Sequence, residues 1–143
     1  TAGGGALGGM LRTAGIQDSV AKLMGAGEQV TGLAILAMAF AVSSLVKFAQ
    51  GSSTVAIITA SSMFAAMGIT SEVLGCHVVY LATAICSGSL VGDWMNDSGF
   101  WVVARMSVLT EIETLKSFTI VTAVVGLTSF GFTLLLACVM PLA

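Results

Sequence analysis

Residues 46–58 read Val-Lys-Phe-Ala-Gln-Gly-Ser-Ser-Thr-Val-Ala-Ile-Ile, which places a polar pentad between two long apolar runs. The runs extend over residues 30–46 and 55–69. As one continuous helix, residues 30–69 would measure roughly 60 Å at 1.5 Å per residue, twice the hydrocarbon thickness of about 30 Å in a bilayer. The pentad at residues 50–54 must therefore break the helix or turn the chain back.

The composition predicts an all-α, polytopic membrane protein. Of the 143 residues 57% are hydrophobic and 8% are charged, whereas soluble domains carry about 25% charged residues. The net charge of -2 offers no basic surface for phosphates, which excludes nucleic acid as a partner. At about 20 residues per span the chain has room for four or five crossings. We therefore expect residues 1–143 to work in the lipid bilayer as a transmembrane region of a larger protein.

The remaining segments alternate between apolar and polar stretches. Glycines are dense in residues 1–27, which we expect to form a re-entrant or hairpin segment, because glycine allows tight turns and close helix packing. The apolar run at residues 77–91 predicts a short helix. Residues 92–101 contain two carboxylates and an amide, and we expect them to form a second polar break. Thr110 and Glu113 have the spacing of a capping box, so residues 110–140 predict an interfacial helix that continues into a final span.

The basic residues favour a single crossing of residues 30–69 as an interrupted helix. The link at residues 70–76 contains no lysine or arginine and would then face away from the basic side of the membrane. By the positive-inside rule that basic side is the cytoplasm. A hairpin with the pentad at its tip is the alternative, and it does not give this agreement. The basic residues concerned are Arg12, Lys22, Arg105 and Lys116.

The pentad is the first candidate site. Irregular backbone persists in lipid only where it lines a wet cavity enclosed by protein, because each unsatisfied backbone group costs several kcal/mol. The half-helix that begins near Ser53 or Thr54 would direct its free N–H groups and the positive end of its dipole at a carboxylate. A Gly-Ser loop among lipid headgroups is the alternative. The predicted binding residues are Gln50, Gly51, Ser52, Ser53 and Thr54.

The second polar break is the candidate for ion coupling. A carboxylate in the hydrocarbon costs roughly 2.5–3.5 kcal/mol, so Asp93 and Asp97 need a partner, a proton or water. Because burial favours the protonated form of a carboxyl group, both are candidate carriers of a coupling proton or sodium ion. Solute contacts are predicted at Asn96, Asp97 and Ser98. A solvated cytoplasmic loop is the alternative.

Other chemistry-bearing residues give weaker signals. Lys47 can be a counter-ion for an anion, or it can snorkel or pair with Asp or Glu. His77, the single histidine, is expected at a membrane interface, and we interpret the three cysteines as packing residues. This inventory allows no metal site and no nucleophile–base pair, so neither an enzyme nor a cofactor is expected.

Four motifs, in this order and spacing, resemble the carboxyl-terminal third of the gluconate permease (gluconate:proton symporter) family. They are Gly-Gly-Gly-Ala-Leu-Gly-Gly-Met-Leu-Arg-Thr-Ala-Gly-Ile (3–16), Ala-Gln-Gly-Ser-Ser-Thr-Val-Ala (49–56), Asn-Asp-Ser-Gly-Phe-Trp (96–101) and Glu-Thr-Leu-Lys (113–116). The resemblance implies a multi-pass bacterial inner-membrane protein of the ion transporter superfamily. It also implies one half of an inverted-repeat fold, with re-entrant hairpins and a substrate site at broken helices.

The chain departs from that family pattern at two places, which marks it as a divergent member. Asp93-Trp94-Met95 stands where the family commonly has Ser-His-Val, and Thr122 stands where many members have a glutamate. Both the solute and the coupling ion, proton or sodium, therefore stay open. We expect a symporter for a small organic anion such as gluconate or another hydroxy-carboxylate. It would act with the remainder of the transporter, on the same or a separate chain, as a monomer or a homo-oligomer. The alternative is a noncatalytic membrane subunit or truncated fragment with a packing role only.

Overall fold

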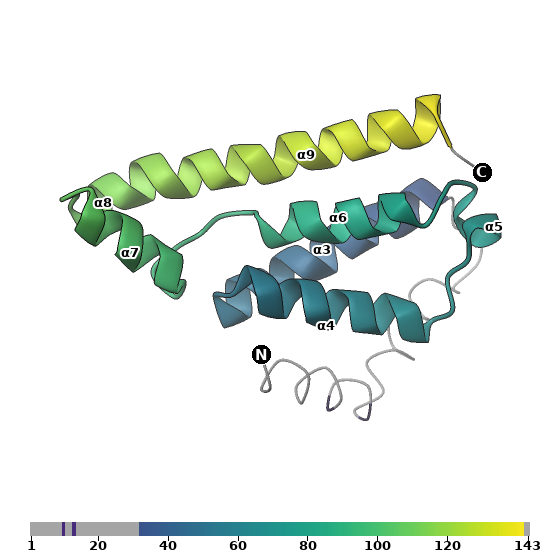
Figure 1. Cartoon of the computed structure of the whole chain (residues 1–143), viewed down its shortest axis with the longest axis horizontal. Helices are drawn as coiled ribbons and strands as arrows, with labels where there is room; N and C mark the ends of the chain where they lie inside the picture. Colours follow the sequence, from purple (N-terminus) through teal and green to yellow (C-terminus); the bar gives the residue numbers. More distant parts are fainter. Residues whose placement is uncertain (1–9, 11–12, 14–31, 142–143) are drawn as a thin grey trace.

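The computed structural model describes residues 10, 13 and 32–141, and within them every regular element is a helix (Figure 1). The predicted all-α fold class is confirmed for this part of the chain, whereas the glycine-rich segment at residues 1–27 lies almost wholly outside it. The elements are α3 (Gly32–Gln50), α4 (Ser53–Ala66), α5 (Ser71–Leu74), α6 (Val79–Ser89), α7 (Ser98–Met106), α8 (Glu111–Thr114), the π-helix η1 (Leu115–Thr119) and α9 (Ile120–Val139).

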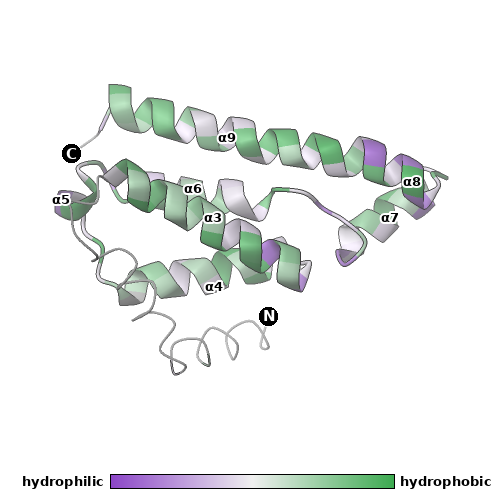
Figure 2. Cartoon of the chain, turned by 180° about the vertical axis from the view of Figure 1, so that it is seen from behind, coloured by the Kyte–Doolittle hydropathy of each residue, from purple (hydrophilic) through white to green (hydrophobic). Residues whose placement is uncertain are grey.

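Within the described part of the chain, two helical stretches are long and apolar enough to cross a bilayer. They are Gly32–Gln50, with 19 residues, and Glu111–Val139, with 29 residues. Figure 2 shows hydrophobic residues along α9, with hydrophilic residues gathered at its α8 end. Helices α4 and α6 are also apolar but have only 14 and 11 residues, which correspond to roughly 21 and 16 Å. Both are shorter than the hydrocarbon core, as expected for broken spans.

Helices α3 and α4 form an antiparallel hairpin, and the predicted single crossing of residues 30–69 is wrong (Figures 1 and 2). Ala39 precedes Gly51 by about three helical turns and Phe64 follows it by as much, yet both belong to one buried cluster. A straight helix would separate them by roughly 37 Å. Gly51 makes the turn with φ +68°, a left-handed conformation that costs glycine little. Only Gly51 and Ser52 of the pentad lie between the helices, because Gln50 ends α3 and Ser53 begins α4.

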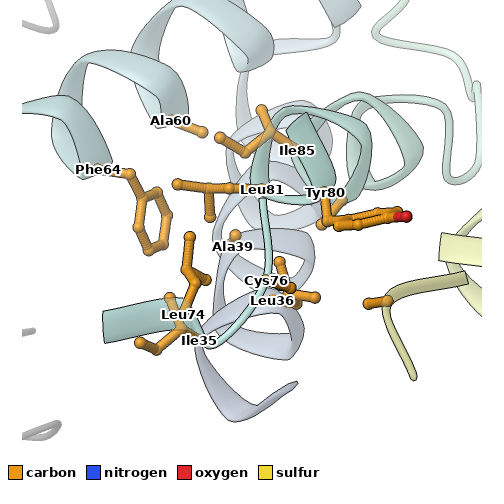
Figure 3. Packing of buried hydrophobic residues seen from close by; sticks show 12 residues of the cluster. Ile35, Leu36, Ala39, Ala60, Phe64, Leu74, Cys76, Tyr80, Leu81 and Ile85 are labelled. Carbon is orange, nitrogen blue, oxygen red and sulfur yellow. The ribbon is translucent and has the colours of Figure 1, made fainter. Parts of the chain in front are cut away.

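The buried core lies where α3, α4 and α6 meet (Figure 3). Across it, Ser43 Oγ donates a hydrogen bond of 2.7 Å to the Ile85 carbonyl. Helix α6 also packs closely on α9, since a Cβ added to Gly126 would lie 2.9 Å from the Ser87 carbonyl oxygen. Small residues and interhelical hydrogen bonds are what hold helices together in lipid. The core residues are Ile35, Leu36, Ala39, Ala60, Phe64, Leu74, Cys76, Tyr80, Leu81, Ala84, Ile85 and Ala137.

The two ends of the bundle differ in the segments they hold (Figure 1). The link between α4 and α6 lies beside the end of α9, where His77 N donates to the Pro141 carbonyl at 2.8 Å. The segment of α7, α8 and η1, with Arg105 in α7 and Lys116 in η1, lies at the opposite end. Arg105 and Lys116 thus lie away from the link, which contains no lysine or arginine, while Arg12 and Lys22 lie outside the described residues.

Two segment boundaries need comment. The capping box is present, with Thr110 N donating to Glu113 Oε2 at 2.9 Å, and the helical stretch from Glu111 runs without interruption through η1 into α9. The second break is shorter than predicted. Residues 90–97 are non-helical, but α7 already begins at Ser98, because the side chain of Asp97 caps it.

Candidate functional site

Lys47 lies at the centre of a buried ion cluster. Its side chain, in the last turn of α3, is 1% exposed. The ammonium group makes ion pairs with Asp93 Oδ1 and Asp97 Oδ2, and it donates a hydrogen bond of 3.0 Å to Ser53 Oγ. The sequence left three interpretations of Lys47 open, and in the structure Lys47 pairs with acidic side chains. One cation between two carboxylates leaves the cluster with one excess negative charge.

The two carboxylates are held in different ways. Asp97 is the N-cap of α7, and its Oδ1 accepts a hydrogen bond of 2.6 Å from Gly99 N while Oδ2 contacts Lys47. Asp93 is anchored through its backbone: its N–H donates to Thr122 Oγ1 at 3.1 Å, and its carbonyl accepts from Thr119 Oγ1. Asp97 is therefore fixed to α7, whereas Asp93 is fixed to η1 and α9.

The two polar breaks touch each other beside this cluster. Asn96 Nδ2 donates a hydrogen bond of 2.7 Å to the carbonyl of Phe48. A Cβ added to Gly51 would lie 2.2 Å from the Asn96 carbonyl oxygen, so the hairpin tip and the second break are in direct backbone contact. The structure thus brings together two segments that α4, α5 and α6 separate in the sequence.

The predicted binding residues divide into an inner and an outer group. Ser53, Asp93 and Asp97 face Lys47, while Gly51 is buried in the contact with Asn96. Ser52 caps α4, its Oγ accepting from Val55 N at 3.4 Å. The remaining predicted polar residues are exposed, and each is close in the sequence to a residue of the inner group. They are Gln50, Thr54, Asn96 and Ser98.

The cluster lies alongside the helix that leads through η1 into α9, not beyond its end. Thr119 and Thr122, which hold Asp93, lie in the first half of the 29-residue helical stretch that begins at Glu111. They lie roughly 12–17 Å along a helix of about 43 Å. The side chains of Asp93 and Asp97 are only 14% and 13% exposed. This burial argues against the alternative of a solvated loop.

Three residues of this arrangement could not be assigned to the site from the sequence. Lys47 allowed more than one interpretation, and Thr119 gives no signal at all. Thr122 stands out in the sequence only as a departure from the family pattern, and Asp93 is part of the other departure; the structure places these two departures in contact.

His77 and the three cysteines make no contact with the cluster among the interactions of the described residues. His77 Nδ1 accepts from Val79 N at the opposite end of the bundle. All three cysteines are free; Cys76 is buried, as a packing residue should be, while Cys86 and Cys138 are exposed. Within residues 32–141 no group of three or more His, Cys, Asp or Glu side chains is placed to hold a metal ion.

Comparison with known proteins identifies the family. A family profile described as GntP family permease matches residues 1–139. The chain is 33% identical over 133 residues to the inner membrane permease YgbN of Escherichia coli K12, covering 93% of this chain and 28% of the relative. It is 30% identical over 119 residues to the low-affinity gluconate transporter of the same strain, covering 83% and 27%.

A third relative, the gluconate permease of Bacillus licheniformis, is 30% identical over 135 residues, covering 94% of this chain and 29% of the relative. The chain thus spans less than a third of the length of the relatives it matches. No solved structure matches it. The chain belongs to the GntP permease family, whose members are membrane transporters and not enzymes, and it is a multi-pass protein of the bacterial inner membrane.

Proposed function

We propose that this chain forms the solute-binding and coupling region of a symporter for a small organic anion, gluconate or another hydroxy-carboxylate. The observation that carries the proposal is the buried Lys47 cluster at the meeting point of two helix breaks. A membrane protein that only packed against a partner would have no need for three buried charges, which are costly in lipid. Two of the relatives described above are gluconate transporters by name, which supports the choice of solute class.

The α3–α4 hairpin is proposed to be re-entrant. Both of its outer ends lie at the end of the bundle that holds the α4–α6 link, while its tip lies at the other end, where Lys47 pairs with Asp93 (Figure 1). A hairpin of this shape enters the bilayer and returns to the same side. Irregular backbone inside the bilayer requires protein or water around it, so the remainder of the transporter, on this or another chain, would enclose the hairpin tip and supply the inverted repeat.

The solute site is proposed at the hairpin tip. Helix α4 begins two residues after Gly51, which contacts the second break, and Ser52 caps only Val55 N, so the other N–H groups of its first turn and its positive dipole end suit a carboxylate. The side chains of Gln50, Thr54, Asn96 and Ser98 offer amide and hydroxyl groups for the hydroxyls of a sugar acid. Carboxylate recognition would thus come from the first break, and hydroxyl recognition from both breaks.

Coupling is proposed at Asp93, with a proton as the ion. The cluster already carries one excess negative charge, and a second anion in the same buried region would be strongly repelled. Neutralising one carboxylate removes that excess. A proton does this without the several oxygen ligands that a metal cation needs.

The experiment that tests the site replaces Ser52 and Ser53 together by alanine in the full-length transporter. We expect uptake of radiolabelled gluconate into proteoliposomes to be lost, with expression unchanged. Ser61→Ala is the matched control, because Ser61 lies on the same helix and its hydroxyl bonds only to the nearby Ile58 carbonyl. Undiminished uptake in the double variant would refute the site, and altered assembly with normal flux would support the packing role. Counterflow against a panel of hydroxy acids identifies the solute.

A further inference from the structure

The charges around Lys47 constrain how an anion can enter the site. Lys47 on α3 is the single cation of the cluster, and Asp93 and Asp97 supply two negative charges. The packed elements otherwise contribute neutral groups: the hydroxyl of Ser53 from α4, and the hydroxyls of Thr119 and Thr122 from η1 and α9. Among the described residues, no other charged side chain makes an ion pair with this cluster.

The two carboxylates differ in what each would lose by leaving Lys47. Asp97 also accepts from Gly99 N, so a shift of its side chain would uncap α7. The carboxyl group of Asp93 caps no helix, and its side chain is held by the ion pair with Lys47. The hydrogen bond from Gly99 N favours the ionised form of Asp97. Asp93 is therefore the carboxylate that can take a proton and leave Lys47 without uncapping a helix.

Burial gives the order of access. The side chain of Lys47 is 1% exposed, whereas those of Asp93 and Asp97 are 14% and 13% exposed. A proton can therefore reach the carboxylates from the outer face of the cluster. A solute anion reaches the ammonium group only after one carboxylate has moved aside.

On the basis of the proposed function, we propose that Asp93 forms an ion pair with Lys47 when no solute is bound. When Asp93 becomes protonated, the carboxylate of the solute takes its place beside the Lys47 ammonium group. Without solute the cluster holds one ammonium and two carboxylates. With solute it holds the ammonium, the Asp97 carboxylate, the neutral Asp93 acid and the solute carboxylate. The net charge is the same in both states, so one proton enters for each solute carboxylate. On release, Asp93 gives up its proton and pairs with Lys47 again.

The test uses the full-length transporter in proteoliposomes with radiolabelled gluconate as the probe. In the wild type we expect the KM for gluconate to rise about tenfold per pH unit once Asp93 ionises. In Asp93→Asn we expect counterflow to persist with a KM independent of pH, while uphill uptake driven by a proton gradient is lost. A KM that stays pH-dependent in Asp93→Asn would overturn the assignment of the proton.

Lys47 is tested with a charge-matched variant. Lys47→Gln alone leaves two unpaired carboxylates and can prevent folding, whereas Lys47→Gln with Asp93→Asn keeps the net charge of the cluster. We expect the double variant to be inserted normally and to show no gluconate counterflow at any pH. Counterflow near the wild-type rate would overturn the role of Lys47 while leaving the proposed function intact. If the wild type transports no acid of the panel, the proposed function fails and this inference fails with it.

Discussion

Gly51→Ala tests whether the contact between the two breaks matters for transport. The added Cβ would meet the Asn96 carbonyl oxygen at 2.2 Å and its carbon at 2.6 Å. Ordinary contacts between non-bonded heavy atoms begin near 3.5 Å, so the hairpin tip and the second break must separate by about 1 Å. The left-handed backbone at φ +68° adds a strain of roughly 1–2 kcal/mol for alanine. A displacement of about 1 Å at a reacting or binding site costs about 100-fold in rate.

The chain offers a control that separates backbone strain from this contact. Gly68 has φ +65°, and a Cβ added there meets nothing within 4 Å. We expect both variants to lose a similar amount of stability to strain, but only Gly51→Ala to lose about two orders of magnitude in initial gluconate uptake. The assay is uptake into proteoliposomes, with thermal unfolding of the purified transporter as the measure of stability. Equal uptake in the two variants would refute the reasoning.

Three further substitutions or probes test the surroundings of the site. Lys47→Gln should lower the free energy of unfolding by about 3 kcal/mol, because two buried carboxylates lose their cation, and adding Asp93→Asn should restore most of it in thermal unfolding. Thr122→Val should cost about 1 kcal/mol and slow gluconate uptake, because it leaves Asp93 N–H without its acceptor; Thr128→Val, whose hydroxyl bonds only within α9, should change neither. Burial, with a smaller effect of nearby Cys138, raises the pKa of the Cys76 thiol. In a variant with Cys76 as its single cysteine, maleimide should therefore label the thiol only after denaturation, and fast labelling of the folded protein would contradict this burial.

The position of both breaks could be predicted from segment lengths, because hydrophobic runs of about 15 residues cannot each form a complete span. The capping box at Thr110 could also be predicted, since it depends on the spacing of Thr110 and Glu113 alone. These features share a local cause. Each is set by the hydropathy or spacing of neighbouring residues, and tertiary packing does not alter it.

The hairpin could not be predicted in this way. A kinked helix and a hairpin have the same length and the same polar pentad, and the choice depends on how α4 packs against α3 and α6. The positive-inside argument favoured the wrong alternative because it treated residues 30–69 as a crossing and then counted Arg12 and Lys22 with the other basic residues. The separation of Arg105 and Lys116 from the α4–α6 link does not depend on that crossing and holds in the structure.

The partners of Lys47 were likewise beyond the reach of sequence spacing. A lysine at the end of an apolar run needs an anion, but Asp93 and Asp97 follow only after α4, α5 and α6, and only the fold decides whether they return to it. Electrostatics limits the possible partners of Lys47, because two buried carboxylates in a polar break require a cation just as a buried lysine requires an anion. In the cluster, the buried lysine and the buried carboxylates therefore compensate each other's charge.

The same cluster also joins segments that would move during the proposed exchange. Asp97 keeps α7 attached to Lys47, and Asn96 keeps the second break attached to the carbonyl of Phe48. When a solute carboxylate replaces Asp93, the link that is lost is the one between Lys47 and the backbone held by Thr119 and Thr122. Solute binding would then loosen the hairpin tip from η1 and α9 while leaving it attached to α7. The π-helical turn η1 contains Thr119, one of the two residues that hold the backbone of Asp93, so it lies where the contact would be released. Such turns are frequent at functional sites in helices.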